Sequence, residues 1–322
     1  LEQHNNRLYL PKLGWLRYRN SRPVEGALCN VAVRRVGGKW FASIQTELEI
    51  ATPVHPATTA VGIDLGIARF ATLSDGTVYE PLHSFKRHEQ ALRKAQQALA
   101  RKVKGSKNWR KAKARVQKMH ARIAHVRQDY LHKLSHAISK NHAVVCLEDL
   151  QVRSMSASAR GTAEAPGKNV RAKAGLNRAI LDQGWGEFRR QLAYKLQWRG
   201  GRLIEVPPQQ TSQTCPRCGH SAAENRQTQA RFACVGCGFE ANADLVAAIN
   251  ILSRGMQRLR DEGRDTADAS AGMGIIPLGI IPQVYWRSQS REGIVPVSPD
   301  GLWIEPQGRS EAGTHRSDSG TP

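Results

Sequence analysis

The stretch Cys215–Asn250 reads CPRCGHSAAENRQTQARFACVGCGFEANADLVAAIN and holds the densest set of candidate metal ligands in the chain. Cys215, Cys218, Cys234 and Cys237 form two Cys-x-x-Cys pairs that 15 residues separate. Each pair lies on a short turn ending in glycine, so two such turns direct four thiolates to one point. Two disulfides, or a chance spacing, are the alternatives. Because four thiolates leave no ligand position for water, we expect a structural Zn²⁺ site.

The residues directly after this zinc ribbon predict a helix that begins near a carboxylate. Asp244 comes seven residues after the last cysteine, and apolar residues follow at helical spacing: Leu245, Ala248, Ile249 and Leu252. A ribbon placed just before this helix would determine where the Asp244 carboxylate points. An aspartate here is also typical of a helix N-cap or of a solvated surface. A functional role therefore depends on other carboxylates that converge with it.

Composition favours a polyanionic partner. The 322 residues carry 48 Lys and Arg against 27 Asp and Glu, a net charge of +21, and the pI is about 10.3. This imbalance usually indicates nucleic acid. The longest apolar run, Ile275–Ile281, is too short to span a bilayer and contains Pro277 and Gly279, so we expect no membrane segment.

The cysteines and the first residues bear on location. Cys29 and Cys146 lie outside the ribbon in apolar sequence, where buried free thiols are expected. Such usage predicts a reducing, cytoplasmic compartment. The first residues, Leu-Glu-Gln-His-Asn-Asn, have no apolar core and do not resemble a signal peptide. They lead directly into a strand pattern, so we expect the first domain to begin upstream of Leu1.

Residues 1–56 are predicted to be β-structure followed by a linker. Short strands are expected at 7–11 and 15–19, and a hairpin at 27–50 whose strands meet at Gly37-Gly38. A proline-containing segment, 52–56, then leads to a buried strand with a single carboxylate, Asp64, between Gly62 and Gly66. An unpaired aspartate in such a strand is costly unless a cation or donors satisfy it. The motif fits the metal-binding first strand of an RNase H-like nuclease and also the phosphate loop of an actin-like ATPase.

Residues 86–140 hold 17 Lys and Arg but only two acids, Glu89 and Asp129. The apolar residues fall at helical spacing on either side of Gly105-Ser106, which predicts a hairpin of two helices with basic outer faces. A solvated helical face normally mixes Glu with Lys, so the scarcity of acids favours phosphate binding. The candidate nucleic-acid-binding residues are Arg93, Lys94, Arg101, Lys102, Lys104, Lys107, Arg110, Lys111, Lys113, Arg115, Lys118 and Arg122.

A second buried strand, 143–150, ends in Glu148-Asp149. Adjacent strand residues point to opposite faces, so only one of the two can join Asp64, and we favour Glu148. A basic loop is expected at 154–175, either as a lid or as a plain linker. An amphipathic helix marked by Leu181, Trp185, Phe188, Leu192 and Leu196 should follow, and then a strand at 202–206 that contains Glu205.

Asp64, Glu148 and Asp244 are the expected catalytic acids. Three carboxylates that converge without a basic partner raise one another's pKa, and divalent cations relieve their repulsion. Hard oxygen ligands favour Mg²⁺ or Mn²⁺. Two such ions activate a water and stabilise the leaving oxygen of a phosphodiester. With the basic hairpin, the residues predict a metal-dependent nuclease, and no small-molecule substrate is expected.

The motifs GIDLG (62–66), VCLEDL (145–150), GWGEFRRQLAYK (184–195), TSQTCPRCGH (211–220) and NADLVAAINIL (242–252) together resemble the TnpB (OrfB) family of insertion sequences, which is related to type V CRISPR effectors. The resemblance covers residues 7–253. It implies an RNA-guided DNA endonuclease of bacteria or archaea with a RuvC-like, RNase H-fold domain. It also implies that Asp64, Glu148 and Asp244 are the catalytic acids, that the cysteines form a zinc ribbon, and that DNA and a guide RNA from the element's end are the partners.

The expected fold is therefore α/β. A partial β-barrel wedge domain occupies residues 1–56 and an RNase H-like (RuvC) nuclease domain residues 57–253, with a basic helical hairpin at 85–140 and a zinc ribbon at 211–240. Residues 254–322 are expected to be a mostly disordered tail. The resemblance also implies that about a hundred family residues precede this chain. A truncated DNA- or RNA-binding protein that does not cleave, a DNA-joining transposase and an actin-like ATPase are the alternatives.

Overall fold

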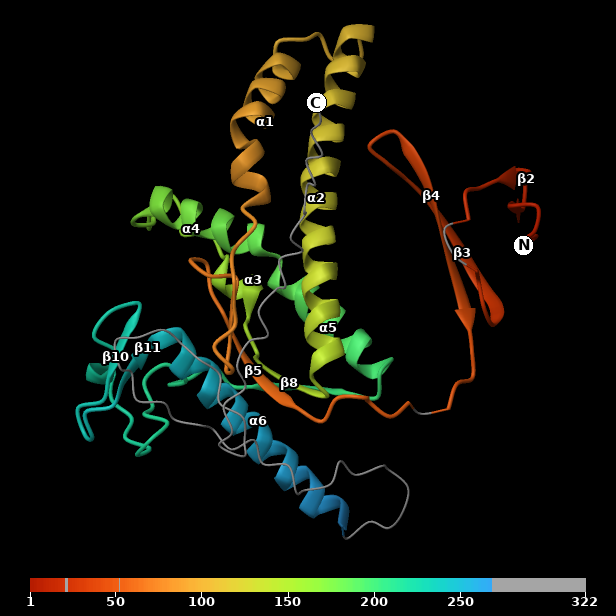
Figure 1. Cartoon of the computed structure of the whole chain (residues 1–322). Coiled ribbons are helices and arrows are strands. Elements are labelled where there is room, and N and C mark those ends of the chain that lie inside the picture. Colours follow the sequence, from red (N-terminus) through yellow and green to blue (C-terminus); the bar gives the residue numbers. More distant parts are fainter. Residues whose placement is uncertain (21–22, 52, 268–322) are drawn as a thin grey trace, which may run out of the picture. The chain divides into compact units, whose positions relative to one another are not determined.

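The structure is a computed structural model that describes residues 1–20, 23–51 and 53–267. Its centre is a five-stranded sheet of order β7-β6-β5-β8-β9 (Figure 1). The strands are β5 (Ala60–Leu65), β6 (Ala71–Leu73), β7 (Val78–Tyr79), β8 (Val144–Glu148) and β9 (Arg202–Val206). β5, β8 and β9 run parallel, whereas β6 and β7 are antiparallel to their neighbours. The carboxyl ends of the three parallel strands therefore lie at one edge, the usual place for a ligand in such a sheet.

The two faces of this sheet are covered by different helices. Val145 and Leu147 of β8 pack in one core cluster with residues of α2 (Lys107–Asn141) and α5 (Trp185–Gln197). Val144 and Cys146 pack in another with Ile251 of α6 (Ala243–Ala267). This alternation follows from the two-residue period of a strand. Glu148 lies two residues after Cys146, and Asp64 lies two residues after Gly62, so both carboxylates lie on the face of the sheet that α6 covers.

Two glycines permit α6 to pack closely on the sheet. A Cβ atom at Gly62 of β5 would overlap the carbonyl oxygen of Ala248, and one at Gly255 of α6 would overlap the sulfur of Cys146. Only a residue without a side chain allows these approaches. Cys146 is fully buried as expected, and burial raises the pKa of its thiol to about 12, so it acts as an inert core residue.

The predicted basic hairpin consists of α1 (Ser84–Ala100) and α2 (Lys107–Asn141) (Figure 1). Ser106 caps α2, because its side chain accepts a hydrogen bond from the Trp109 amide at 3.1 Å. The start of α1 is capped from elsewhere: the Asp182 carboxylate accepts hydrogen bonds from the Ser84 hydroxyl (2.7 Å) and the Phe85 amide (2.9 Å). Asp182 belongs to α4, so the base of the hairpin is anchored to the rest of the fold.

The segment after β8 differs from the prediction. The short helix α3 (Val152–Met155) is followed by α4 (Val170–Gln183) and α5 (Trp185–Gln197), so the expected loop at 154–175 is helical from Val170. The expected single helix is also wrong, because Gly184 has a φ of +76° and separates α4 from α5. The positive φ favours glycine at the break, and a Cβ atom there would make a tight 3.1 Å contact with the Leu131 side chain of α2.

The N-terminal residues form two separate hairpins, as their sequence predicts. β1 (Arg7–Leu10) pairs with β2 (Gly14–Arg17), and β3 (Ala27–Val36) pairs with β4 (Lys39–Glu47). Within the described residues each hairpin is its own two-stranded sheet, and the barrel stays a prediction. The expectation that Cys29 is buried is wrong: it is exposed, because β3 pairs only with β4 here and neither its faces nor its outer edge is covered.

The C-terminal helix is longer than its apolar pattern suggested. α6 continues to Ala267, so the prediction of a tail beginning at residue 254 is wrong for 254–267. Met256 and Leu259 pack against the core that α6 shares with β8 and β9, which explains the extension. The apolar segments 275–284 and 294–304 lie outside the described residues. Among the residues that the structure describes, no helix combines the length and the hydropathy that crossing a bilayer requires.

Candidate nuclease and metal sites

The four cysteines of the ribbon converge as their spacing predicts. One ligand atom from each lies within 4.8 Å of the others, with the Sγ atoms of Cys215 and Cys237 3.7 Å apart and those of Cys218 and Cys234 3.6 Å apart. The two turns end at glycines 219 and 238 with φ values of +77° and +69°. This four-sulfur arrangement is able to hold one tetrahedral metal ion.

A buried asparagine that the sequence analysis missed joins the two halves of the ribbon. Asn225 is fully buried; its amide donates to the carbonyls of Gln213 (2.8 Å) and His220 (3.0 Å), and its oxygen accepts from the Val235 amide (2.9 Å). It lies in the short 3₁₀ helix Ala223–Asn225, between the cysteine pairs. The hairpin of β10 (Arg231–Ala233) and β11 (Glu240–Asn242) then leads to α6. Sequence carried no signal for Asn225, because asparagine in a loop is usually solvated.

The carboxylates of Asp64, Glu148 and Asp244 approach one another at the edge where β5 and β8 end and α6 begins. Asp64 is the penultimate residue of β5, Glu148 is the last residue of β8, and Asp244 lies in the first turn of α6. Asp244 is not the helix cap. Asn242 is the N-cap of α6, because its side chain accepts a hydrogen bond from the Asp244 amide at 3.0 Å. The Asp244 carboxylate is therefore left for another role.

The electrostatics of Asp64 show that these three groups act on one another. Burial, then the Glu148 carboxylate and then that of Asp244, raises the pKa of Asp64 to about 7. Burial also raises the pKa of Glu148, against the hydrogen bond from Thr211 and the charges of Arg254 and Arg226. A carboxyl group that titrates near neutrality in this way is common in functional sites. A bound cation would offset the repulsion between the carboxylates.

The three carboxylates nevertheless stand farther apart than the cysteines. Among the described residues, the ribbon is the only group of three or more His, Cys, Asp or Glu whose ligand atoms all lie within 4.8 Å. The nearest charged partner of Asp244 is Arg69, whose guanidinium lies 4.0 Å from the carboxylate. No hydrogen bond or ion pair to the Asp64 side chain occurs within the part of the chain that the structure describes. Within the described residues, the contact of Arg69 with Asp244 is thus the one ion pair of the three acids.

Asp149 and Glu205, the competing acids, belong to the opposite face of the sheet. Both pair with Arg189 of α5: its Nη1 lies 2.8 Å from the Asp149 carboxylate, and its Nε lies 2.8 Å from that of Glu205. Leu147 of β8 pairs with Glu205 of β9, so the Glu205 side chain lies on the same face of the sheet as Leu147 and on the opposite face from Glu148. One arginine thereby pairs with both acids on the face of the sheet opposite α6.

Glu148 has a partner that the sequence analysis did not identify. The Thr211 hydroxyl donates to Glu148 Oε1 at 2.5 Å, and Thr211 is buried. Its carbonyl oxygen accepts a hydrogen bond from the buried Asn250 side chain of α6 at 2.7 Å. The only sequence signal was position, since Thr211 directly precedes the ribbon.

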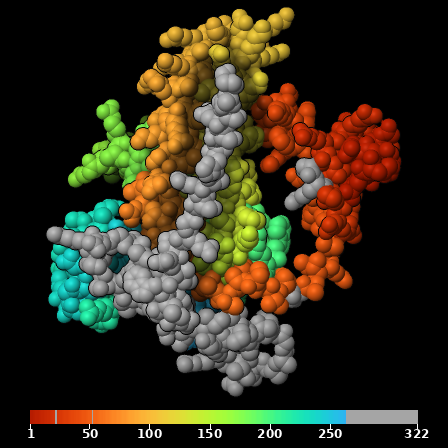
Figure 2. Space-filling view, viewed as in Figure 1, coloured from red at the N-terminus to blue at the C-terminus, as the bar shows by residue number. Residues whose placement is uncertain are grey.

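The twelve cationic candidates on the hairpin are all exposed. None of them forms an ion pair within the described residues, whereas Lys133, nearer the end of α2, is paired with Asp129. In the space-filling view, long side chains project from the end of the hairpin where α1 meets α2 (Figure 2). This part of the chain thus presents positive charge that no carboxylate of the described residues neutralises, as phosphate binding requires.

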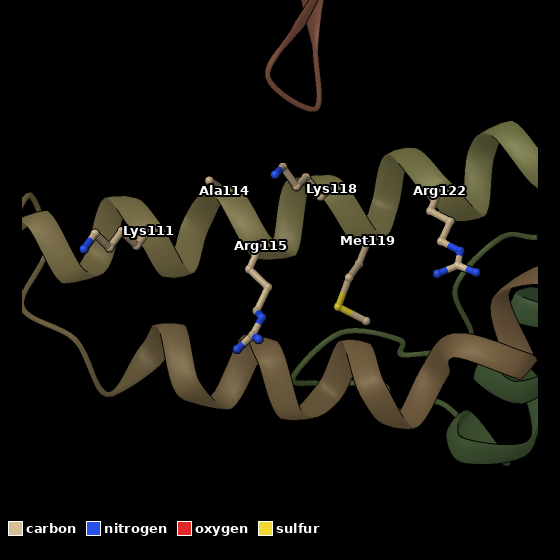
Figure 3. A pocket seen from close by; sticks show the side chains of 6 residues that line it. All are labelled: Lys111, Ala114, Arg115, Lys118, Met119 and Arg122. Carbon is tan, nitrogen blue, oxygen red and sulfur yellow. The ribbon is translucent and has the colours of Figure 1, made fainter.

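A shallow pocket on the hairpin gathers four of these cations. It is lined by Lys111, Ala114, Arg115, Lys118, Met119 and Arg122 of α2. Arg115 and Met119 point toward α1, as Figure 3 shows. The cations recur at intervals of three or four residues, which places them along one side of the helix. Positive charge therefore lines the pocket along the helix axis, beside the apolar surface of Ala114 and Met119.

Comparison with known proteins agrees with this arrangement. Residues 43–159 match the family OrfB_IS605, described as "Probable transposase", and residues 185–251 match the Cas12f1-like TNB domain. The chain is 58% identical over 79% of its length to "Putative RNA-guided DNA endonuclease InsQ" of Escherichia coli, and 37% identical over 73% to "Putative RNA-guided DNA endonuclease" of Streptomyces pristinaespiralis. It is 28% identical over 66% to "CRISPR-associated endodeoxyribonuclease Cas12f1" of Sulfoacidibacillus thermotolerans.

The chain spans 63%, 56% and 50%, respectively, of the lengths of these three relatives. The matched regions include every strand of the central sheet, the basic hairpin, the ribbon and the first turns of α6. On these matches, the chain carries the OrfB_IS605 and Cas12f1-like TNB domains and is similar to RNA-guided DNA endonucleases of the TnpB (OrfB) type.

Proposed function

We propose that this protein is an RNA-guided, metal-dependent DNA endonuclease linked to transposition, with its active centre at Asp64, Glu148 and Asp244. The observation that carries the proposal is the meeting of three carboxylates from β5, β8 and α6, whose one ion pair within the described residues is the 4.0 Å contact of Arg69 with Asp244, and the pKa of Asp64 that burial and then the other two acids raise to about 7. Elsewhere on the same sheet, the acids are paired with Arg189. Carboxylates with so few ion pairs are suited to divalent cations.

The fold in this proposal is an RNase H-like (RuvC) nuclease domain over residues 57–253. It is supported by a five-stranded sheet whose two outer strands on one side are antiparallel and whose remaining three are parallel, with acids at the ends of β5 and β8. The hairpin at 85–140 and the ribbon at 211–240 are insertions in it, and residues 1–56 form part of a β-barrel wedge domain. Their sequence positions and the family resemblance support this division.

The donor set fits Mg²⁺ or Mn²⁺. Carboxylate oxygens are the hard ligands that these ions prefer, and the repulsion that raises the pKa of Asp64 is what a cation would remove. When bound, such ions supply an activated water and stabilise the leaving oxygen of a phosphodiester. Asp64, Glu148 and Asp244 would hold them. Thr211 orients Glu148, and Arg69 and Arg254 place positive charge beside the acids, where a phosphate approaches.

For the ribbon we propose Zn²⁺ with a structural role. Four thiolates at mutual distances within 4.8 Å match its tetrahedral preference and leave no position open for substrate. β11 leads from the ribbon to Asn242 and α6 begins at Ala243, so metal binding in the ribbon would order the turn that carries Asp244. Because these thiols must remain reduced to bind a metal, we place the protein in the cytoplasm.

The exposed cations of the hairpin would hold the nucleic acid. Their lack of acidic partners in the described residues, together with the names of the relatives as RNA-guided DNA endonucleases, supports guide RNA and target DNA as the partners. We expect affinity for the guide RNA to fall ~10³–10⁵-fold between 50 and 200 mM salt if the hairpin contacts 6–10 phosphates. Neutralising Arg110, Lys111, Lys113 and Arg115 together should flatten that slope; an affinity that salt leaves unchanged would contradict the role of the hairpin.

The cleavage proposal is tested with the protein co-expressed with the RNA from the element's end. Mg²⁺-dependent cutting of a DNA that matches the guide is expected, and Asp244→Asn should abolish it while leaving guide RNA affinity unchanged. Asp129→Asn, on the exposed surface of α2 and paired with Lys133, is the matched control and should cut like the parent. Cleavage by Asp244→Asn at the parent rate, or cleavage in the presence of a chelator, would refute the proposed chemistry.

A further inference from the structure

The segment between β9 and the first cysteine, residues 207–214, connects the two candidate metal sites; we call it the connector. At its middle, Thr211 is buried and its hydroxyl lies 2.5 Å from Glu148 Oε1 and 3.1 Å from the carbonyl oxygen of Pro208. A hydroxyl has one proton, and a carboxylate is the stronger acceptor. Thr211 therefore donates to Glu148, and within the described residues this is the hydrogen bond that orients the Glu148 carboxylate.

Two side chains of α6 hold the connector in place. The Asn250 amide donates to the carbonyl oxygens of Thr211 (2.7 Å) and Thr214 (2.8 Å). One turn further along, Arg254 Nη1 donates to the carbonyl oxygen of Gln209 at 2.6 Å and approaches that of Pro207 at 3.2 Å. Asn250 is buried, so its two hydrogen bonds to the connector are shielded from solvent. The helix that carries Asp244 thus also fixes the residue that contacts Glu148.

The other end of the connector belongs to the cysteine cluster. Thr214 is followed directly by Cys215, whose amide donates to the His220 carbonyl at 2.8 Å within the first turn of the ribbon. Asn225, from between the cysteine pairs, donates to the carbonyl oxygen of Gln213 at 2.8 Å. Three residues separate Thr211 from the cysteine ligand Cys215, and the connector carbonyls of Gln209, Thr211, Gln213 and Thr214 each accept a hydrogen bond. Hydrogen bonds therefore hold the connector in a defined conformation between the ribbon and the Glu148 carboxylate.

We propose that Thr211 is a positioning residue that sets the Glu148 carboxylate for binding the divalent cation, and that Asn250 and the ribbon hold Thr211 in place. This inference rests on the proposed function, because it gives Glu148 a cation to bind. With Oε1 held by the hydroxyl, the rotation of the carboxylate is restricted, and Oε2 keeps no hydrogen-bond partner within the described residues. Partners of this kind typically change metal affinity 10–100-fold.

The main test compares Thr211→Val, which keeps the branched shape and removes the hydroxyl, with Thr211→Ser, which keeps the hydroxyl. Mn²⁺ binding to the zinc-loaded protein is measured by the electron paramagnetic resonance of free Mn²⁺. Thr211→Val should weaken binding ~10–100-fold, and Thr211→Ser should remain within about threefold of the parent. The zinc content and the melting temperature of the metal-free protein are recorded as well, because a merely structural role would lower these and leave Mn²⁺ affinity unchanged.

Two outcomes separate the inference from the function on which it rests. If the parent binds Mn²⁺, Glu148→Gln abolishes that binding and Thr211→Val leaves it intact, the positioning role is refuted and the proposed function stands. If the parent does not bind Mn²⁺, or if Glu148→Gln does not weaken that binding, both the positioning role and the proposed function are refuted. In cleavage assays with guide RNA, Thr211→Val should raise the Mg²⁺ concentration needed for half-maximal rate by a similar factor.

The link through Asn250 is tested by a double-mutant cycle. Asn250→Ala removes the two donors to the connector and leaves all four cysteines in place. It should weaken Mn²⁺ binding, and the Thr211→Val/Asn250→Ala double variant should be little weaker than Thr211→Val alone, because both changes act on the same hydrogen bond. Losses in affinity that simply multiply would show that Asn250 acts independently of Thr211 and would remove the second half of the proposal.

Discussion

The central sheet carries acids on both of its faces, and the two groups differ in how their charge is satisfied. On the α5 face, Asp149 and Glu205 share one guanidinium, Arg189, at 2.8 Å from each. On the α6 face, Asp64 and Glu148 face Asp244, and the nearest ion pair, between Arg69 and Asp244, measures 4.0 Å. Acids one residue apart in sequence, 148 and 149, thus belong to opposite groups.

This difference separates carboxylates that are available to a ligand from carboxylates that form ion pairs within the fold. Both acids of the α5 group have an arginine partner within the chain and are partly exposed to solvent. In the α6 group, burial and then the charges of Glu148 and Asp244 raise the pKa of Asp64, so keeping its carboxylate ionised lowers the stability of the fold. Such a cost is retained where a ligand relieves it. Three experiments on the two groups follow, ordered from the largest expected effect.

The largest contrast should come from Glu148→Gln and Asp149→Asn. Each replaces a carboxylate by an amide of the same shape, but on opposite faces of the sheet. Glu148→Gln should lower Mg²⁺-dependent cleavage by about three orders of magnitude or more, since it removes a ligand of the ions on which the chemistry depends. Asp149→Asn should cleave within about tenfold of the parent. Single-turnover rates with guide RNA bound measure both; equal losses would show that the two faces do not differ in function.

An intermediate effect is expected on the pH dependence of stability without divalent ions. The folded pKa of Asp64, about 7, lies above its ordinary value of 3.8, so this group favours folding fully only below pH 4. Its contribution is lost as pH rises from about 4 through about 7. Asp64→Asn should therefore be more stable than the parent at pH 8 and similar to it at pH 4. Urea unfolding in EDTA, with the ribbon zinc retained in a control sample, measures the difference.

The control for this pH effect lies on the other face. Asp149→Asn should show no such gain at pH 8, because Asp149 is paired with Arg189 and has nothing to recover on losing its charge. Adding Mg²⁺ should reduce the advantage of Asp64→Asn, since the cation stabilises only the parent. A stability difference between Asp64→Asn and the parent that does not change with pH would show that Asp64 does not titrate near neutrality.

The smallest effect is expected from Arg189→Ala. The variant leaves Asp149 and Glu205 without a common partner, and all three side chains are partly exposed, so solvent screens much of their interaction. We expect a loss of about 1 kcal/mol in unfolding free energy, and cleavage by the folded protein close to that of the parent. Arg189→Lys should recover only part, because an ammonium cannot bridge two carboxylates as a guanidinium does. Urea midpoints at neutral pH test this; a large loss of Mn²⁺ affinity would mean that Arg189 also orders the α6 face.

Much of the secondary structure follows from local patterns. The strands around Asp64 and Glu148, the two-helix basic hairpin and the N-terminal hairpins lie where alternation, helical spacing and glycine turns predict them. The errors have tertiary causes. Gly184, with a positive φ and in tight contact with α2, divides one apolar stripe into two helices, and α6 extends to Ala267 because Met256 and Leu259 find a core beside β8 and β9. Cys29 is exposed because its strand has one partner within the described residues.

The sequence by itself determined which residues come in sets: four thiols in two Cys-x-x-Cys turns, acids at the ends of apolar strands, and cations along two helices. Such spacing involves residues that are close in sequence, so it can be recognised without knowledge of the tertiary structure. Only the tertiary structure decided how the sets are used. The covering of one sheet face by α6 selects Glu148, Arg189 comes 40 residues after Asp149 to pair with it, and Thr211 and Asp182 each satisfy a partner far away in sequence. These contacts depend on side chains that meet only when strands and helices pack, and no local pattern encodes them.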